Sequence, residues 1–69
     1  MSKKPLTARE IQVLDLVAAG LRHKEIGQRL GVTKHTVDHH LDHVKAKLGA
    51  LTSAHAVALR AGYKAVTVP

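Results

Sequence analysis

The sequence contains no cysteine, phenylalanine or tryptophan, and Tyr63 is its single aromatic residue. Without cysteine, neither a disulfide nor a thiolate-bound zinc ion can stabilise the fold, so aliphatic packing must hold it together. The same absence indicates an intracellular protein, and we expect it in the cytoplasm. Because aromatic rings form the stacking platforms that bind single-stranded nucleic acid, we do not expect that class of partner.

The chain also lacks the length and the apolar runs that several other classes of protein need. Its 69 residues suffice for one small domain but not for an enzyme with a deep cleft. The only Ser/His neighbours, Ser53 and His55, have no evident orienting acid, so we expect no catalysis. No long apolar span or signal sequence is present, which argues against a membrane. A net charge of +6 instead predicts a polyanionic partner, double-stranded DNA above all.

Capping residues and glycines divide the chain into predicted helices. Thr7 and Glu10 have the spacing of a capping box, in which each side chain accepts a hydrogen bond from an orphan backbone N–H. No stretch alternates with period two for long enough to form a sheet, so the predicted fold class is all-α. The predicted helices cover residues 8–19, 23 or 24 to 30, 33–48 and 53–61, with Thr33 and Ser53 as N-caps of the last two. They form one domain over residues 6–62, between a flexible N-terminal tail (1–5) and a short C-terminal tail (63–69).

The second and third predicted helices have the pattern of a helix-turn-helix. This motif needs a small residue where its two helices cross and a glycine in the turn. Gly27 and Gly31 have the required spacing, and the expected buried positions hold Ile26, Leu30, Val32 and Val37. The alternative is that Gly27 merely weakens an ordinary helix, by about 1 kcal/mol relative to alanine.

At these residues the chain resembles the LuxR-type (GerE-like) helix-turn-helix domain. The matching segments are LTAREIQVLDLVAAGL from Leu6, KEIGQRLGV from Lys24, TVDHHLDHVKAKLGA from Thr36 and AVALRAG from Ala56. The resemblance implies a four-helix DNA-binding domain whose third helix enters the major groove and whose fourth helix often forms a dimer. Members usually end a longer regulator, but nothing precedes Met1 here, so we expect a stand-alone member.

The predicted helix over residues 33–48 has one apolar and one polar side. At about 100° per residue, Val37, Leu41, Val44 and Leu48 share the core side, with His40 half-buried at its margin. The opposite side is the predicted base-reading face; it contains His35, His39, Asp42 and His43, joined at the helix start by Lys34 and Asp38. The predicted phosphate contacts are Lys24, Thr33, Lys34, Thr36, Lys45 and Lys47, supported by Arg22 and Arg29.

Asp38 and Asp42 are unexpected on a helix that binds DNA, because family members often carry a lysine in place of Asp38. An aspartate can accept a hydrogen bond from cytosine N4, which contributes about 1–3 kcal/mol of discrimination. Electrostatic repulsion between the aspartate and nearby phosphates costs about 1 kcal/mol. Lys34 and Lys45 are also spaced to form surface ion pairs of about 0.3–0.5 kcal/mol with these residues. For Asp38 base reading and pairing remain equally open, whereas for Asp42 pairing is favoured.

The histidines suggest two further hypotheses. His35, His39 and His43 repeat every four residues, and neighbouring members could hold a metal ion while Asp42 offered an oxygen. Nothing completes a closed tetrahedral site, so we expect no metal and no cofactor. The milder hypothesis is that DNA affinity rises on acidification, because histidine titrates at about pH 6.5 and its charged form attracts phosphate.

The last predicted helix suggests a homodimer. Ala54, Val57, Ala58 and Ala61 form one apolar stripe, and Ala56 and Leu59 add apolar surface on the other side. One side would face the core and the other a second copy, which would place two recognition helices about one DNA turn apart. The predicted dimerisation residues are Ala54, Val57, Ala58 and Ala61.

The sequence therefore predicts a sequence-specific transcriptional regulator that binds double-stranded DNA as a homodimer. The alternative is a module that keeps the fold but uses residues 33–48 to grip a separate protein partner. The acidic side chains of Asp38 and Asp42 are the reason to consider it.

Overall fold

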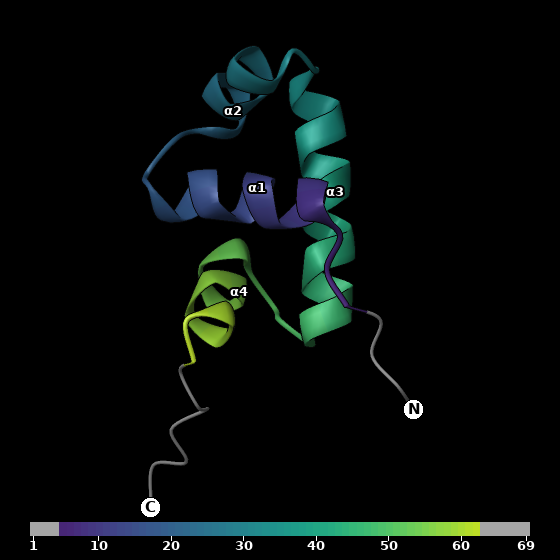
Figure 1. Cartoon of the computed structure of the whole chain (residues 1–69), viewed down its shortest axis with the longest axis vertical. Coiled ribbons are helices and arrows are strands. Elements are labelled where there is room, and N and C mark those ends of the chain that lie inside the picture. Colours follow the sequence, from purple (N-terminus) through teal and green to yellow (C-terminus); the bar gives the residue numbers. More distant parts are fainter. Residues whose placement is uncertain (1–4, 63–69) are drawn as a thin grey trace, which may run out of the picture.

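The structure is a computed structural model that describes residues 5–62, and these residues form four helices and no strand (Figure 1). The helices are α1 (Ala8–Ala18), α2 (His23–Leu30), α3 (Lys34–Leu48) and α4 (Ser53–Arg60). The predicted all-α fold class is therefore confirmed. The predicted tails, residues 1–5 and 63–69, lie outside the described residues except for Pro5.

The predicted N-caps of α1 and α3 are present. The backbone N–H of Thr7 donates to Oε1 of Glu10 at 2.8 Å, and the backbone N–H of Glu10 donates to Oγ1 of Thr7 at 3.1 Å. This is the complete capping box. At α3, Oγ1 of Thr33 accepts from the backbone N–H of Thr36 at 3.2 Å. Two helix starts are thus determined by local side-chain chemistry.

The predicted N-cap of α4 was wrong by one residue. Thr52, not Ser53, has the extended backbone of a cap, and its Oγ1 accepts from the backbone N–H of His55 at 3.0 Å. Threonine and serine both suit this position, so composition alone could not choose between these neighbours. The ends of α1 and α4 differ from the prediction by one residue as well, because Ala19 and Ala61 are C-caps and not helical residues.

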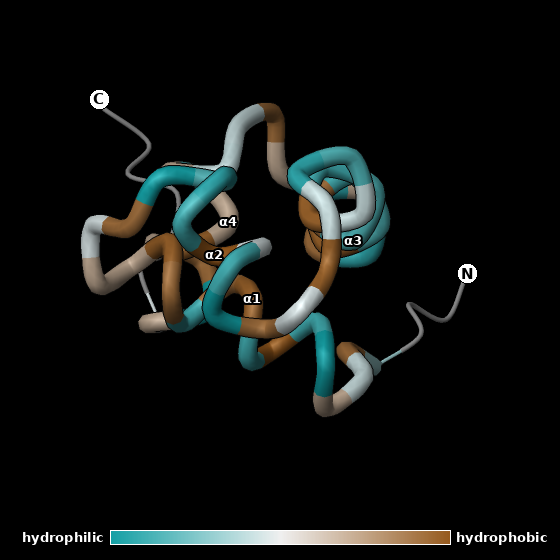
Figure 2. The backbone as a smooth tube through the Cα atoms, turned by 90° about the horizontal axis from the view of Figure 1, so that it is seen from above, coloured by the Kyte–Doolittle hydropathy of each residue, from teal (hydrophilic) through white to brown (hydrophobic). Residues whose placement is uncertain are grey.

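The other three helices all pack against α3. In Figure 1, α1 lies across α3, with α2 and α4 on either side of α1. Figure 2 shows that the hydrophobic side of α3 faces the other helices and its hydrophilic side faces outward. His40 is half-buried at the margin, as predicted. The fully buried apolar core consists of Val13, Leu14, Ile26, Val37, Leu41, Val44 and Ala56.

Gly27 and Gly31 set the geometry between α2 and α3. A Cβ atom on Gly27 would lie only 2.6 Å from the backbone oxygen of Val32, so the two segments approach too closely for a larger residue without a shift. Gly31 has φ 73°, a left-handed conformation that favours glycine, and its N–H bonds the carbonyl of Gly27. The helix-turn-helix is therefore confirmed, and the interpretation of Gly27 as a mere helix-weakening residue is wrong.

Candidate nucleic-acid interface

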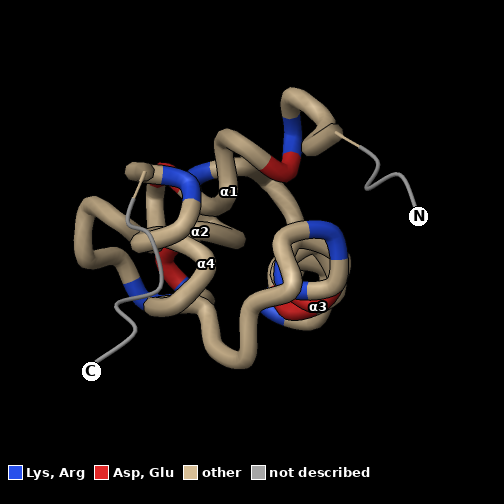
Figure 3. The backbone as a smooth tube through the Cα atoms, turned by 90° about the horizontal axis from the view of Figure 1, so that it is seen from below, with Lys and Arg blue, Asp and Glu red and all other residues tan. Residues whose placement is uncertain are grey.

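The predicted base-reading face of α3 is open to solvent. His35, His39, Asp42 and His43 are all exposed, and they lie opposite the buried side of the helix. Figure 3 shows that lysines and aspartates both lie along α3. The outer face is therefore mixed in charge and rich in hydrogen-bonding groups, which suits base edges more than a uniformly basic surface would.

Two of these histidines lie against each other. The ring centroids of His39 and His43 are 4.5 Å apart in an edge-to-face arrangement. Over residues 5–62, no group of three or more histidine, cysteine, aspartate or glutamate side chains is placed to hold a metal ion.

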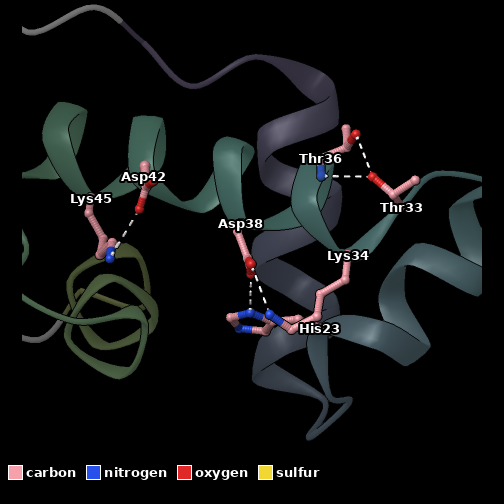
Figure 4. Close-up of polar contacts among 7 residues, drawn as sticks. All are labelled: His23, Thr33, Lys34, Thr36, Asp38, Asp42 and Lys45. Atoms are coloured by element: carbon pink, nitrogen blue, oxygen red, sulfur yellow. Dashed lines mark hydrogen bonds and ion pairs between the residues drawn. The ribbon is translucent and has the colours of Figure 1, made fainter.

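The N-terminus of α3 gathers hydroxyl groups next to a basic residue. Oγ1 of Thr33 lies 3.1 Å from Oγ1 of Thr36, and the exposed Lys34 follows Thr33 in the chain with its ammonium group directed toward Asp38 (Figure 4). Helix N-termini favour anions because their backbone N–H groups and the helix dipole present positive charge. These residues form the part of the predicted phosphate-binding set that the structure brings together most closely.

Asp38 is held by two side chains, the ammonium group of Lys34 and the imidazole ring of His23. Its Oδ2 accepts from Nζ of Lys34 at 2.9 Å, which is the predicted ion pair, and its Oδ1 lies 2.6 Å from Nδ1 of His23 (Figure 4). The hydrogen bond from Lys34 and then that from His23 hold the pKa of Asp38 below its usual value. Sequence reasoning missed His23, because no helical periodicity links it to a residue on another helix.

Asp42 pairs with Lys45, as favoured from the sequence, but less closely. Its Oδ1 lies 3.4 Å from Nζ of Lys45, and the aspartate side chain is 69% exposed. Such an exposed pair contributes about 0.5 kcal/mol or less. The carboxylate of Asp42 is therefore much freer than that of Asp38 to meet another group.

Lys47 is not placed as a free phosphate-binding group. Its Nζ lies 2.6 Å from Oε1 of Glu10, whose side chain is buried, and 3.4 Å from the carbonyl oxygen of Pro5. His43 approaches the other oxygen of Glu10, with Nδ1 at 3.9 Å. Burial raises the pKa of Glu10, but hydrogen bonds from Lys47 and Thr7 outweigh it, so the pKa is lowered overall. This cluster attaches α3 to the start of α1.

The other predicted phosphate contacts lie on different parts of the surface. Lys24 on α2 is exposed and forms no ion pair with any described residue. Lys45 is half-buried beside Asp42, and Arg22 and Arg29 are exposed on the flanks of α2. The structure thus leaves most of the predicted basic groups accessible to a polyanion.

The predicted apolar stripe of α4 lies partly against the core and partly in contact with solvent. Ala56 is fully buried, and Val57 is half-buried against the core, so this side of α4 faces the other helices. Ala54 and Ala61 are exposed and Ala58 is half-buried. The nearby Leu51 is 87% exposed.

Residues 5–62 include no helix with the length and apolar character needed to cross a membrane.

Comparison with known proteins gives one family. Residues 4–60 match the family described as bacterial regulatory proteins, luxR family. The chain is 46% identical over 50 residues to the transcriptional regulatory protein MctR of Rhizobium johnstonii. The matched segment covers 72% of the chain and 23% of MctR. The chain is also 44% identical over 46 residues to the oxygen regulatory protein NreC of Staphylococcus aureus. Here the matched segment covers 67% of the chain and 21% of NreC. The chain thus matches less than a quarter of the length of each of these relatives.

Proposed function

The chain belongs to the luxR family of bacterial regulatory proteins, and from this premise we propose that it binds duplex DNA in a sequence-specific way to regulate transcription. In this proposal α3 lies in the major groove and its exposed face reads base edges. Because its target is bacterial DNA, the protein acts in the cytoplasm. MctR and NreC carry regulatory names, and their matched segments support this assignment.

The observation that carries the proposal is the exposed face of α3 on a helix-turn-helix with the required close crossing. The crossing at Gly27 sets α3 against α2, and the same packing leaves His35, His39, Asp42 and His43 exposed. A helix held in this way can enter a major groove about 12 Å wide with its outer side chains against the bases.

We assign the residues of this surface to two roles. His35, His39, Asp42 and His43 are the base-reading group, because they occupy the outermost face of α3. The phosphate group consists of side chains with hydroxyl or ammonium donors: Thr33, Lys34 and Thr36 at the start of α3, Lys45 further along it and the exposed Lys24 on α2. Lys47 acts differently, because its ammonium group holds Glu10 and so keeps α3 against α1.

The protein is also proposed to bind DNA as a homodimer through α4. Ala54, Ala58 and Ala61 leave apolar surface accessible on this helix, and the exposed Leu51 lies just before it. A two-fold axis at α4 would place two copies of α3 about one DNA turn apart. The expected binding site is therefore a pair of inverted half-sites.

The experiment that tests the proposal is selection from a random duplex DNA library with the purified protein. Binding to the best sequence is then measured at several salt concentrations. If a dimer makes about six to eight phosphate contacts, log affinity falls against log salt with a slope of about −5 to −7. Recovery of a two-fold-symmetric motif with this steep slope supports the regulator.

Recovery of no motif, even at low salt, contradicts the proposal. The alternative is then the protein-binding module, which the acidic residues of α3 suggest. One argument for that alternative is weaker than the sequence suggested, because the carboxylate of Asp38 already bonds the ammonium group of Lys34 and the ring of His23.

A further inference from the structure

We propose that His23, in the first turn of α2, contacts the DNA backbone, and that Asp38 positions His23 and Lys34 for DNA instead of reading a base. This inference rests on the proposed function, because it requires the exposed face of α3 to lie on a duplex. It gives a role to His23, which the sequence patterns did not single out, and it selects one of the two interpretations of Asp38.

Both carboxylate oxygens of Asp38 already have partners. Nδ1 of His23 lies 2.6 Å from Oδ1, and Nζ of Lys34 lies 2.9 Å from Oδ2. Figure 4 shows these side chains converging on one carboxylate from α2 and from the first turn of α3. The two bonds use part of the acceptor capacity of the carboxylate and fix its orientation toward His23 and Lys34, so a cytosine amino group could use only the remaining lone pairs in that orientation. Positioning is therefore the role that the geometry of Asp38 favours.

The charge of this cluster also suits DNA, although Asp38 is acidic. One carboxylate meets the ammonium of Lys34 and the ring of His23. When the ring is protonated, the cluster has a net positive charge and attracts phosphate. Asp38 therefore does not present an unpaired negative charge to the duplex.

The second ring nitrogen of His23 is available for a contact. Nδ1 donates to Asp38, because an ionised carboxylate can only accept. No described residue bonds Nε2, and residues 5–62 contain no buried side-chain nitrogen or oxygen without a partner, so Nε2 is open to solvent. A phosphate oxygen also only accepts, so it binds Nε2 when both ring nitrogens carry protons.

The contact from His23 to phosphate is consequently strengthened by acidification. Asp38 bonds the ring directly, and Lys34 reaches the same carboxylate, both from α3. α1 also packs against α2, and none of its described charged side chains forms an ion pair with His23. On α2 itself the charged neighbours in sequence are Arg22, Lys24 and Glu25, of which Glu25 bonds the backbone N–H of Arg22.

The test measures affinity for the selected duplex at fixed salt, at about pH 6 and at about pH 8, on either side of the pH at which histidine titrates. We expect H23Q to weaken binding about 3- to 10-fold at the lower pH, the loss of one charge-assisted contact, and less at the higher pH. The loss should be equal on all duplexes, because a phosphate contact reads no sequence. H23K, which restores a cation, should recover most of it.

The role of Asp38 is tested by combining substitutions. In the D38N background, H23Q should weaken binding by less than about 2-fold, because the amide oxygen of asparagine offers the ring only an uncharged and weaker hydrogen bond. D42N is the matched control, since Asp42 lies on the same helix and does not contact His23, and H23Q should keep its full effect there. D38N itself should select the same DNA motif as the wild type. Thermal unfolding verifies that each variant folds.

Two results would overturn the inference. One is a change of preference at a single base pair in D38N, which would mean that Asp38 reads a base. The other is a full effect of H23Q in the D38N background, which would mean that Asp38 does not position the ring. Failure of the proposed function is distinguishable from both, because in that case the wild-type protein itself binds no duplex.

Discussion

Glu10 and Lys47 join the first turn of α1 to the last turn of α3, with Oε1 of the buried glutamate 2.6 Å from Nζ of the lysine. The two residues are 37 positions apart in the sequence. Because a buried carboxylate without a partner is unfavourable, this pair fixes where α3 lies against the rest of the domain.

Removing either member should destabilise the domain. We expect E10Q and K47M each to lower the free energy of unfolding by about 1–3 kcal/mol, because the remaining partner loses a charge-assisted hydrogen bond. The double variant should lose less than the two together. Urea unfolding measures all three. K45M is the matched control and should change stability by about 0.5 kcal/mol or less, since its partner Asp42 is exposed. A K47M variant as stable as K45M would contradict this prediction.

Stability should fall in acid. The pKa of Glu10 is lowered in the folded state, from an ordinary value of 4.5. The folded protein then binds fewer protons than the unfolded chain, so the stabilisation is present above the ordinary value and is lost as pH falls toward the folded-state pKa. The lowered pKa of Asp38 acts in the same direction. Unfolding measured between about pH 6 and about pH 3 should show a smaller loss for E10Q than for the wild type. Equal losses would count against the Glu10 assignment.

The two glycines of the helix-turn-helix should respond to substitution for different reasons. Gly31→Ala should lower the free energy of unfolding by about 1 kcal/mol, because only its left-handed backbone is unfavourable for alanine and no atom lies within 4 Å of the added Cβ. Gly27→Val should lower it by about 3 kcal/mol, since the new side chain would meet the backbone at Val32 and Thr33. Thermal unfolding ranks the two. The reverse order would mean that the helices do not cross as closely as described.

The cap of α4 can be assigned by two neighbouring substitutions. Thr52→Ala should lower the free energy of unfolding by about 1 kcal/mol, because Oγ1 of Thr52 satisfies the backbone N–H of His55. Ser53→Ala should change it by less than about 0.5 kcal/mol, since Ser53 is a helical residue without a capping bond. Chemical unfolding distinguishes them. If Ser53→Ala is the more damaging change, the cap lies where the sequence pattern first placed it.

The proposed dimer should be sensitive to charge on α4. Ala54 is exposed in the first turn of this helix, where a glutamate is compatible with the helix dipole, so Ala54→Glu should fold. Two such charges brought together across a two-fold axis should weaken binding to paired half-sites about 10-fold or more. Gln12→Glu on the exposed side of α1 adds the same charge elsewhere. Equal losses in the two variants, measured on paired half-sites, would exclude α4 as the interface.

The fold class, the approximate helix bounds and the exposed face of α3 were predictable from the sequence alone. These features depend on residues close together in the chain. Thr7 with Glu10 and Thr33 with Thr36 start helices through bonds that span three positions. The Lys34–Asp38 pair spans one helical turn and was therefore also predictable.

Which polar groups meet across helices depends on how the helices pack, and the sequence patterns did not predict it. His23 bonds Asp38 from 15 positions away, and Lys47 bonds Glu10 from 37 positions away. No periodicity within one helix encodes such distances, because they depend on how α1, α2 and α3 cross. These crossings bring the ring of His23 to Asp38 and direct Lys47 to Glu10, and so they decide which charges of this basic domain stay accessible to a partner.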